Sequence, residues 1–301
     1  MKFNNSTDPR AHDAAQTIQW FPGHMAKTER QIEKDLKLAD AAVEMIDARI
    51  PRSSRNPVLD RLLGGKPRVV LMNRADLADP EQTARWLAYF RSCGYGALSA
   101  DCKSGKNVNQ LLPQVESVLK DKIASWCAKG MAGRKIRIMV VGIPNIGKSS
   151  LINRLAGGSR AAVENRPGVT RANQWFPVGG NAEMLDTPGV LWPKFSDALV
   201  GEHLAFTGAV KDDVLDIELL AGSLLEALRE IAPELLAGRY KIAPEEMSER
   251  DGNAMLELIG RKRGMLMGGG TVDTERAARM LLDEFRSAKL GRITLEQAEQ
   301  P

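Results

Sequence analysis

The first two thirds of the chain alternate short apolar runs with stretches of helical spacing. Six of the runs are short, rich in aliphatic residues and bounded by polar residues, as strands of a buried sheet are. Glu81–Ser92 and Val108–Lys120, which lie between them, show helical spacing. This alternation predicts an α/β fold with a mainly parallel sheet. The predicted strands are Ala42–Ile46, Val69–Met72, Ala97–Ser99, Ile136–Val141, Gln174–Val178 and Glu183–Leu185.

The pattern changes beyond about residue 205. Asp213–Ile231 and Asp273–Leu290 carry apolar residues at helical spacing, and no strand pattern lies between them. Met267–Gly270 reads as a loop, and Thr271 or Asp273 can cap the helix that follows it. We therefore predict a small all-helical domain after the α/β domain. The expected boundaries are 1–17 for a disordered polar tail, 18–200 for the α/β domain and 205–301 for the helical domain.

Composition narrows the class of protein only slightly. Hydrophobic residues make up 43% of the chain and charged residues 27%, as in soluble globular proteins. The first seventeen residues contain no apolar stretch, and no run approaches the ~18 residues of a membrane span, so we expect a cytoplasmic protein. Cys93, Cys102 and Cys127 have no C-x-x-C spacing, which favours reduced thiols over a disulfide framework or a zinc site.

A phosphate-binding loop is the clearest motif. Gly142–Ser149 reads G-I-P-N-I-G-K-S, directly after a predicted strand and before a helical stretch. The glycines let backbone N–H groups surround a phosphate at a helix N-terminus. Lys148 brings charge to the β- and γ-phosphates, and the Ser149 hydroxyl can ligate Mg²⁺. The predicted phosphate-binding residues are Asn145, Ile146, Gly147, Lys148, Ser149 and Ser150.

A second motif selects the base. Asn73, Arg74 and Asp76 form N-R-A-D after the strand Val69–Met72. The Asp76 carboxylate can accept two hydrogen bonds from guanine, whereas adenine would leave it unpaired at high cost. The backbone of Ser99-Ala100, after the next strand, can add an N–H to the guanine O6. Either motif is weak alone, but together with the phosphate loop they predict binding of GTP and GDP.

A third motif completes the site. Asp186-Thr-Pro-Gly189 follows the last predicted strand, where Asp186 would hold Mg²⁺ through a water and the Gly189 N–H would sense the γ-phosphate. Thr170, in the sequence R-P-G-V-T-R, can be the second hydroxyl ligand of Mg²⁺. A threonine in an ordinary loop is the alternative for Thr170.

The order of the motifs is circularly permuted, because the base-reading motif precedes the phosphate loop. The loops can still gather at the carboxyl edge of one sheet, since moving the chain ends leaves the strand arrangement intact. The segment after D-T-P-G then leads directly into the helical domain. Loss of γ-phosphate contacts could therefore shift that domain.

These motifs, with Trp20–Met25 (W-F-P-G-H-M) and Asp47–Pro51 (D-A-R-I-P), resemble the bacterial ribosome biogenesis GTPase A family. The resemblance runs from Ile18 to Leu295 and includes Asp283–Arg292. It implies a circularly permuted Ras-like P-loop GTPase that acts in late maturation of the large ribosomal subunit. One departure is Arg74, where the family has lysine; the charge remains, but the hydrogen-bond geometry differs.

The residues for hydrolysis are less clear. Val190 stands where Ras-like enzymes place a glutamine that orients water. Asn145 matches the asparagine that ligates potassium in related GTPases; a plain loop asparagine is the alternative. The histidine matching His24 has been proposed to act on the water in this family, against a structural or RNA-contacting role. The candidate catalytic residues are His24, Asn145, Lys148 and Thr170.

Cations line two predicted helices. On a helix over Ala26–Leu38, four cations share one face, opposite Ile32 and Leu36. Such a face can bind RNA phosphates or can simply be solvated; the resemblance favours RNA. The cations are Lys27, Arg30, Lys34 and Lys37 in this helix, and Arg261, Lys262, Arg263, Arg276, Arg279 and Arg286 in the tail.

The sequence therefore predicts a monomeric, cytoplasmic GTPase with Mg²⁺ and K⁺ as cofactors, stimulated by the large ribosomal subunit. A rival hypothesis is a nucleotide-gated RNA-binding module in which hydrolysis is incidental. A small-molecule phosphotransferase is disfavoured, because no further acid–base group accompanies the phosphate loop and Asp76 points to guanine.

Overall fold

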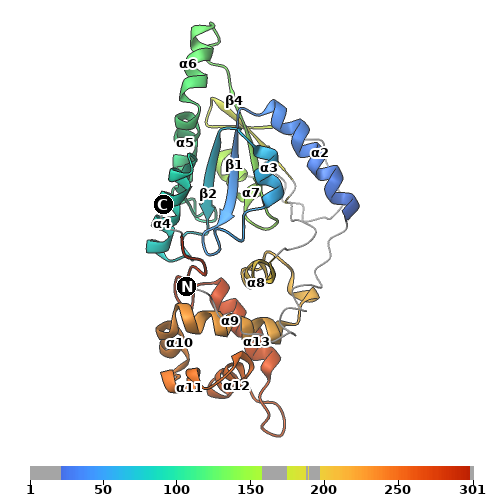
Figure 1. Cartoon of the computed structure of the whole chain (residues 1–301), viewed down its shortest axis with the longest axis vertical. Helices are drawn as coiled ribbons and strands as arrows, with labels where there is room; N and C mark the ends of the chain where they lie inside the picture. Colours follow the sequence, from blue (N-terminus) through green and yellow to red (C-terminus); the bar gives the residue numbers. More distant parts are fainter. Residues whose placement is uncertain (1–21, 158–174, 188, 190–196, 299–301) are drawn as a thin grey trace. The chain divides into compact units, whose positions relative to one another are not determined.

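The computed structural model describes residues 22–157, 175–187, 189 and 197–298, without the side chains of residues 22–28 and 214. Contacts within the chain separate it into two units (Figure 1). We call residues 21–193 with 296–301 the sheet domain, and residues 194–295 the helical domain. The predicted tail, residues 1–17, lies outside the described residues. None of the described helices is long and apolar enough to cross a membrane.

The sheet domain contains one six-stranded sheet in the order β3-β2-β1-β4-β6-β5. The first five of these strands run parallel, and β5 is antiparallel to β6. All six predicted strands are confirmed, and so is the mainly parallel α/β fold. Their bounds are β1 Ala41–Asp47, β2 Arg68–Asn73, β3 Gly96–Ser99, β4 Ile136–Gly142, β5 Trp175–Val178 and β6 Ala182–Asp186.

Strand β1 lies at the centre of the sheet, and each of its seven residues is buried. Helices pack on both faces of a parallel sheet, so its strands read as nearly continuous apolar runs. Glu44, in the middle of β1, is an exception. Its buried carboxylate accepts hydrogen bonds from Arg55 (3.0 and 3.1 Å) and Arg68 (3.1 Å), which compensate for its removal from water.

The helices of the sheet domain differ from the prediction in two places. Helix α3 was not predicted; Pro57 begins it, and the Asn56 side chain accepts from the Val58 N–H. The helical stretch predicted over Val108–Lys120 consists of a 3₁₀ turn (Val108–Gln110) and α5, and the helix that follows from Lys120, α6, was not predicted. The bounds are α2 Pro22–Leu38, α3 Pro57–Leu63, α4 Pro80–Ser92, α5 Leu111–Val118, α6 Lys120–Ala128 and α7 Lys148–Leu155.

Helix α2 is amphipathic, as its spacing predicted. Ile32 and Leu36 are buried against Met139 and Val141 of β4. The other face carries the exposed Arg30, Lys34 and Lys37. The apolar face fixes α2 to the sheet and leaves these three cations in water.

The helical domain contains the two long helices predicted from spacing and several shorter ones. Asp273 is the cap of α13 and accepts from the Arg276 N–H at 3.0 Å. Helices α9 and α12 touch through backbone, because a Cβ on Gly252 would overlap the carbonyl of Gly222. The bounds are α8 Ala198–Phe206, α9 Ile217–Ile231, α10 Pro233–Tyr240, α11 Pro244–Ser248, α12 Gly252–Lys262 and α13 Thr274–Arg286.

Arg286 was expected to share an RNA-facing surface, and this expectation is wrong. Its guanidinium donates to both carboxylate oxygens of Asp212 and to the carbonyls of Ala205 and Phe206. The side chain is therefore used inside the helical domain, where it ties α13 to the end of α8. Helical spacing alone could not separate it from the exposed Arg276 and Arg279.

The end of the chain belongs to the sheet domain. The Glu296 carboxylate accepts from the backbone N–H groups of Arg52 (2.5 Å) and Ser53 (3.0 Å) and from the Ser53 hydroxyl. The Glu296 carbonyl accepts from Trp86 Nε1 at 2.9 Å. One residue thus holds the loop after β1 and helix α4.

Glu296→Ala should lower the melting temperature by roughly 3–8 °C, because charge-assisted hydrogen bonds each contribute about 1.5–3 kcal/mol. Differential scanning calorimetry measures the change. Glu33→Ala, an exposed position on α2, is the control. An equal melting temperature for Glu296→Ala and wild type would show that these contacts add no net stability.

Candidate nucleotide-binding site

The predicted motifs meet because the strands that precede them are parallel. Parallel strands end at the same edge of a sheet, and ligands bind at that carboxyl edge in open α/β folds. The structure brings together loops that are far apart in the sequence. The residues at the strand ends are Asp47 for β1, Asn73 for β2, Ser99 for β3, Gly142 for β4 and Asp186 for β6.

The phosphate loop leads into α7 through backbone conformations that favour glycine. Gly147 has φ 103° and Asn145 has φ 58°. Gly147 is the N-cap of α7, and no described side chain caps this helix. The first N–H groups of a helix have no partner within it, so a phosphate can accept from them here.

Lys148 lies in the predicted place for a phosphate contact. Only 7% of its surface is exposed, and its ammonium donates to the carbonyls of Gly142 (3.1 Å) and Ile143 (2.8 Å). Burial lowers the pKa of Lys148 to about 8, although the charge of Asp186 acts in the opposite direction. A buried ammonium gains from a nearby anion, which a nucleotide phosphate would supply.

Ser149 and Asp186 form the core of the predicted magnesium site. The Ser149 hydroxyl donates to Asp186 Oδ2 at 2.9 Å. The other oxygen, Oδ1, is buried without a hydrogen-bond partner among the described residues. Burial raises the pKa of Asp186, while Ser149 and Lys148 oppose this shift. A hydroxyl and an unsatisfied carboxylate oxygen are hard ligands that suit Mg²⁺.

Asn73 connects two loops of the site. Its Nδ2 donates to the Ile146 carbonyl in the phosphate loop at 2.6 Å, and its Oδ1 accepts from the Cys102 N–H at 2.9 Å. The side chain is buried, so both of its polar atoms need these partners. Asn73 therefore positions the phosphate loop beside the turn after β3.

Gly147→Ala should weaken GDP binding at least tenfold. A Cβ on Gly147 would lie 2.6 Å from Asn73 Nδ2, and φ 103° is unfavourable for alanine. Equilibrium binding of a fluorescent GDP analogue measures the change. Gly180→Ala, which also has positive φ but has open space around its Cβ, is the matched control for backbone strain.

Arg74 joins the base-reading loop to the phosphate loop. Its guanidinium donates to the Asn145 carbonyl at 2.8 Å and to Asp47 Oδ2 at 3.2 Å. Asp47 is buried and also accepts from Arg49 at 2.8 and 3.0 Å. Burial pushes the pKa of Asp47 up, but Arg49 and Arg74 outweigh it and hold this pKa below its usual value.

Asp47 and Arg49 form a buried pair for which no separate role was predicted. Both side chains are almost fully buried, with exposed fractions of 2% and 1%. They lie at the end of β1, at the same sheet edge as the other motifs. This position, directly after a predicted strand, is the signal from which their role in the site could have been predicted. Together they hold Arg74 over the phosphate loop.

The base-reading residues agree only in part with the expectation. Asp76 is exposed in the loop after β2, and its charge is felt by Arg74. In the Ser99-Ala100 segment, whose backbone was expected to offer an N–H to guanine, the Ala100 N–H donates to the Met72 carbonyl at 2.9 Å. The sheet hydrogen bonds therefore extend one residue past β3. Ser99 is half-buried, and its carbonyl accepts from the Asn107 side chain.

The D-T-P-G turn lies against the phosphate loop. The Thr187 hydroxyl donates to the Val140 carbonyl of β4 at 2.7 Å. A Cβ on Gly189 would lie 2.6 Å from Pro144 Cα and 3.0 Å from Lys148 Nζ. Only glycine permits this approach, which puts the Gly189 backbone next to the lysine that would hold the phosphates.

Three expectations for hydrolysis cannot be placed completely. The backbone of His24 lies in the first turn of α2, which begins at Pro22. Its side chain lies outside the described residues, as do Thr170 and Val190. Asn145 is exposed in the phosphate loop, and Ser150 is exposed on α7.

Known proteins are similar to this chain along nearly its whole length. Residues 137–230 match the family model described as 50S ribosome-binding GTPase. Ribosome biogenesis GTPase A of Priestia megaterium is 48% identical over 291 residues, which cover 95% of this chain and 99% of the relative. Mitochondrial ribosome-associated GTPase 1 of Mus musculus is 34% identical, covering 96% and 92%.

A solved structure leads to the same family. The crystal structure of GNP-bound YlqF from T. maritima superposes with a TM-score of 0.62 at 26% identity, covering 91% of this chain and 100% of that one. The motifs at one edge of a permuted sheet and the full-length identity to curated relatives agree. The chain belongs to the ribosome biogenesis GTPase A family.

Proposed function

We propose that this protein is a GTP-hydrolysing ribosome assembly factor that acts in late maturation of the large ribosomal subunit, which stimulates its hydrolysis. The observation that carries the proposal is the meeting of the motif loops of β1, β2, β4 and β6 at one sheet edge. Lys148, Ser149, Asp186 and Gly189 lie together there. The printed names of the curated relatives support the ribosomal role.

In this proposal, Lys148 and the first N–H groups of α7 bind the β- and γ-phosphates. Ser149, Thr170 and Asp186 would hold Mg²⁺, whose charge offsets that of the phosphates. Asn145 would ligate K⁺, which supplies positive charge where other GTPases use an arginine finger. Asp76 reads guanine, while Arg74, held by Asp47, closes the base-reading loop onto the phosphate loop.

The exposed cations of α2 and of the helical domain are the proposed contacts to ribosomal RNA. Arg30, Lys34 and Lys37 face water along one side of α2. In the helical domain, Arg276 and Arg279 are exposed on α13. Since D-T-P-G leads into this domain, γ-phosphate loss would alter its placement on the subunit. Because the proposed action is on ribosomal subunits, we propose that the protein is cytoplasmic and acts as a monomer.

The GTP turnover rate with purified large or small ribosomal subunits tests this proposal. We expect a large increase with large subunits only, in potassium buffer and not in sodium buffer. Asn145→Ala should remove the difference between the two buffers. An unchanged rate with large subunits would contradict the proposal.

A second candidate is a nucleotide-gated RNA-binding module in which hydrolysis is incidental. Val190 favours it, because valine cannot orient water. Single-turnover hydrolysis on large subunits, compared between wild type and His24→Ala, separates the two functions. A large loss of rate with unchanged subunit binding supports a catalytic His24 and an enzyme; unchanged hydrolysis supports the gated module.

A further inference from the structure

A basic surface lies at the end of the sheet domain that is opposite the nucleotide motifs. Between residues 120 and 137 the chain carries six cations and one acidic residue, Asp121. They belong to α6, to the loop after it and to the start of β4, whereas the phosphate loop follows the other end of β4. We call Lys120, Lys122, Lys129, Arg134, Lys135 and Arg137 the α6 basic surface; all six are exposed.

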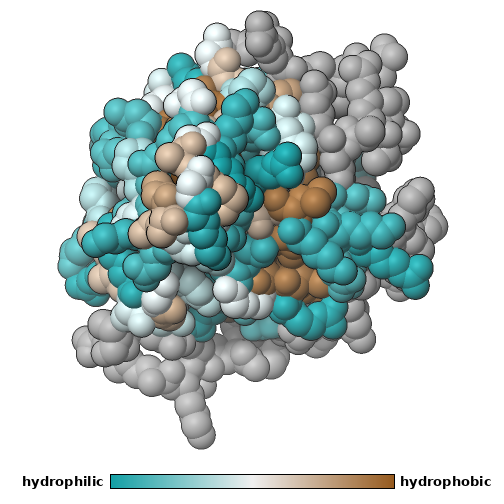
Figure 2. Space-filling view, turned by 90° about the horizontal axis from the view of Figure 1, so that it is seen from above, coloured by the Kyte–Doolittle hydropathy of each residue, from teal (hydrophilic) through white to brown (hydrophobic). Residues whose placement is uncertain are grey.

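Helix α6 is built to face outward. None of its nine residues is buried, although the preceding α5 buries Leu111 and Val115. Figure 1 shows α6 extending beyond the sheet, and Figure 2, which looks onto this end, shows mainly hydrophilic residues beside a hydrophobic area. A helix that adds no side chain to the core has its surface available for a partner.

The acidic groups here are too few for the cations around them. The buried Asp40 carboxylate lies 3.2 Å from Lys122 and 3.2 Å from Arg134. Burial lowers the pKa of the nearby Lys66. The charge of Lys122 lowers this pKa further, whereas the charge of Asp40 raises it. Two cations thus share one carboxylate with Lys66 nearby, and an incoming anion would relieve the repulsion among the three.

The same imbalance recurs nearby. Glu183 serves both Lys135 (3.1 Å) and Arg137 (3.6 Å). Glu116 accepts from the Asn181 side chain at 2.7 Å. Lys120 and Lys129 have no acidic partner among the described residues. The acidic groups that face this surface are therefore Asp40, Asp121, Glu116 and Glu183, against seven cations when Lys66 is included.

Aromatic rings stand between these cations. The Arg134 guanidinium lies 4.0 Å from the centre of the Trp126 ring, and Lys122 lies 5.5 Å from it. Arg137 lies 5.4 Å from the centre of the Trp175 ring. Trp126 is only partly buried. Arginine planes and exposed aromatic rings are the surfaces on which unpaired bases stack.

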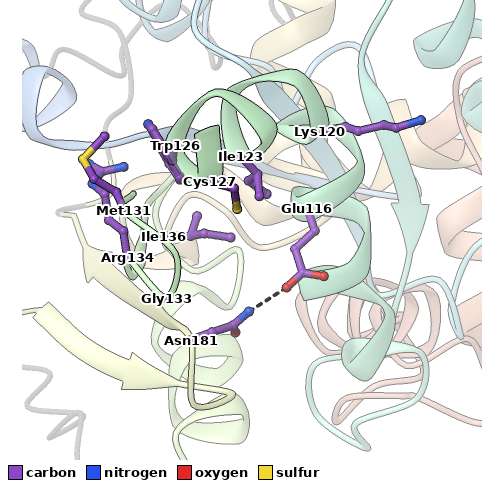
Figure 3. Close-up of a pocket in the computed structure, with 10 residues that line it drawn as sticks. All are labelled: Glu116, Lys120, Ile123, Trp126, Cys127, Met131, Gly133, Arg134, Ile136 and Asn181. Carbon is purple, nitrogen blue, oxygen red and sulfur yellow. Dashed lines mark hydrogen bonds between the residues drawn. The ribbon is translucent and has the colours of Figure 1, made fainter. Parts of the chain in front are cut away.

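A hollow of about 450 Å³ opens beside Trp126. Figure 3 shows Ile123 and Cys127 projecting into it from α6 toward Ile136 of β4, with Asn181 below. Arg134 lines its edge. Its volume lies within the ~300–1,000 Å³ of small-ligand sites, and its apolar walls, amide and flanking guanidinium match the needs of one nucleobase.

We propose that the α6 basic surface binds RNA, with a phosphate backbone on its cations and an unpaired base in the hollow beside Trp126. This inference rests on the proposed ribosomal function for its biological setting, but its chemistry is independent of the nucleotide site. Charge and stacking favour RNA over an acidic protein segment, which would use the cations and leave the hollow and the guanidinium–indole pair without a role.

The test measures binding of the full-length GDP-bound protein to a fluorescent single-stranded RNA of mixed sequence, about 20 nucleotides long. Lys120→Ala/Lys129→Ala should weaken binding about tenfold, and the slope of log affinity against log salt should fall by roughly 1.4. Trp126→Leu should weaken it by a similar factor. GDP affinity should be unchanged in both variants, which also shows that they fold.

The matched control is Arg85→Ala/Arg91→Ala, which removes the same charge from exposed positions on α4. An equal loss in this control, or RNA binding by the Lys120/Lys129 variant equal to wild type, would overturn the proposal. If the Lys120/Lys129 variant keeps its RNA binding but loses binding to a glutamate-rich peptide, the partner of this surface is an acidic protein segment and not RNA.

This experiment can fail separately from the proposed function. If large subunits stimulate turnover and the Lys120/Lys129 variant binds RNA normally, the proposed GTPase function stands. The proposal that the α6 basic surface binds RNA is then wrong. Subunits without effect on turnover, together with the expected loss of RNA binding, would give the reverse result.

Discussion

Lys148→Ala should reduce GTP turnover by about 10²–10³-fold, because removal of one preorganised donor to a developing negative charge has this effect in other enzymes. Lys148 is the buried cation of the phosphate loop, and its ammonium donates to two backbone carbonyls, at 2.8 and 3.1 Å. Turnover is measured by phosphate release at saturating GTP, so that weaker binding does not enter the rate.

Stability gives a second readout for the same variant. Burial lowers the pKa of Lys148, which means that the folded protein holds its charge at a cost. Lys148→Ala without nucleotide should therefore melt close to the wild-type temperature, while stabilisation by added GDP should shrink. Lys106→Ala, an exposed lysine of the same domain, is the control. A rate within a factor of three of wild type would contradict the assigned role.

The sheet could be predicted because its strands are buried on both faces. Apolar runs such as Ile136–Val141 then need no alternation with polar residues, and the helical segments between them fix parallel connections. The nucleotide motifs sit at strand ends, so their meeting at one edge followed from the fold. For this reason the permuted motif order could be interpreted from the amino-acid sequence alone.

Other features depend on contacts that no local pattern encodes. Helix α6 was not predicted, and none of its residues is buried, so it has no apolar face that local spacing could mark. Arg286 shares spacing with exposed arginines but finds Asp212 from a distant turn. The Ala100 N–H donates to the Met72 carbonyl of the neighbouring strand, which the sequence around Ala100 does not indicate. Arg286 and Ala100 each have a partner that is remote in sequence.

The buried pair of Asp47 and Arg49 changes how the departure at Arg74 is understood. A lysine in that position would have one ammonium nitrogen. It could not donate to Asp47 and to the Asn145 carbonyl from two separate nitrogens held in one plane, as a guanidinium can. Arg74 does both, at 3.2 and 2.8 Å. Arg74 therefore forms a bridge between the end of β1 and the phosphate loop.

Asp76→Asn should weaken GDP binding by about 10²–10⁴-fold, because each hydrogen bond to a charged acceptor contributes roughly 1.5–3 kcal/mol. The asparagine side chain offers one acceptor oxygen and one NH₂ donor group. The N–H would face the amine of guanine, whereas xanthine carries a carbonyl at that place. We therefore expect the variant to bind XDP more tightly than GDP, measured by competition against one fluorescent nucleotide.

The reversal of preference is the decisive part of this result, since a merely destabilised protein would lose both nucleotides together. Glu81→Gln makes the same chemical change at an exposed position on α4 and should leave GDP binding unchanged. If Asp76→Asn binds GDP as wild type does, then base recognition lies elsewhere at this edge. If it loses GDP and gains no XDP, Asp76 supports the loop and does not read the base.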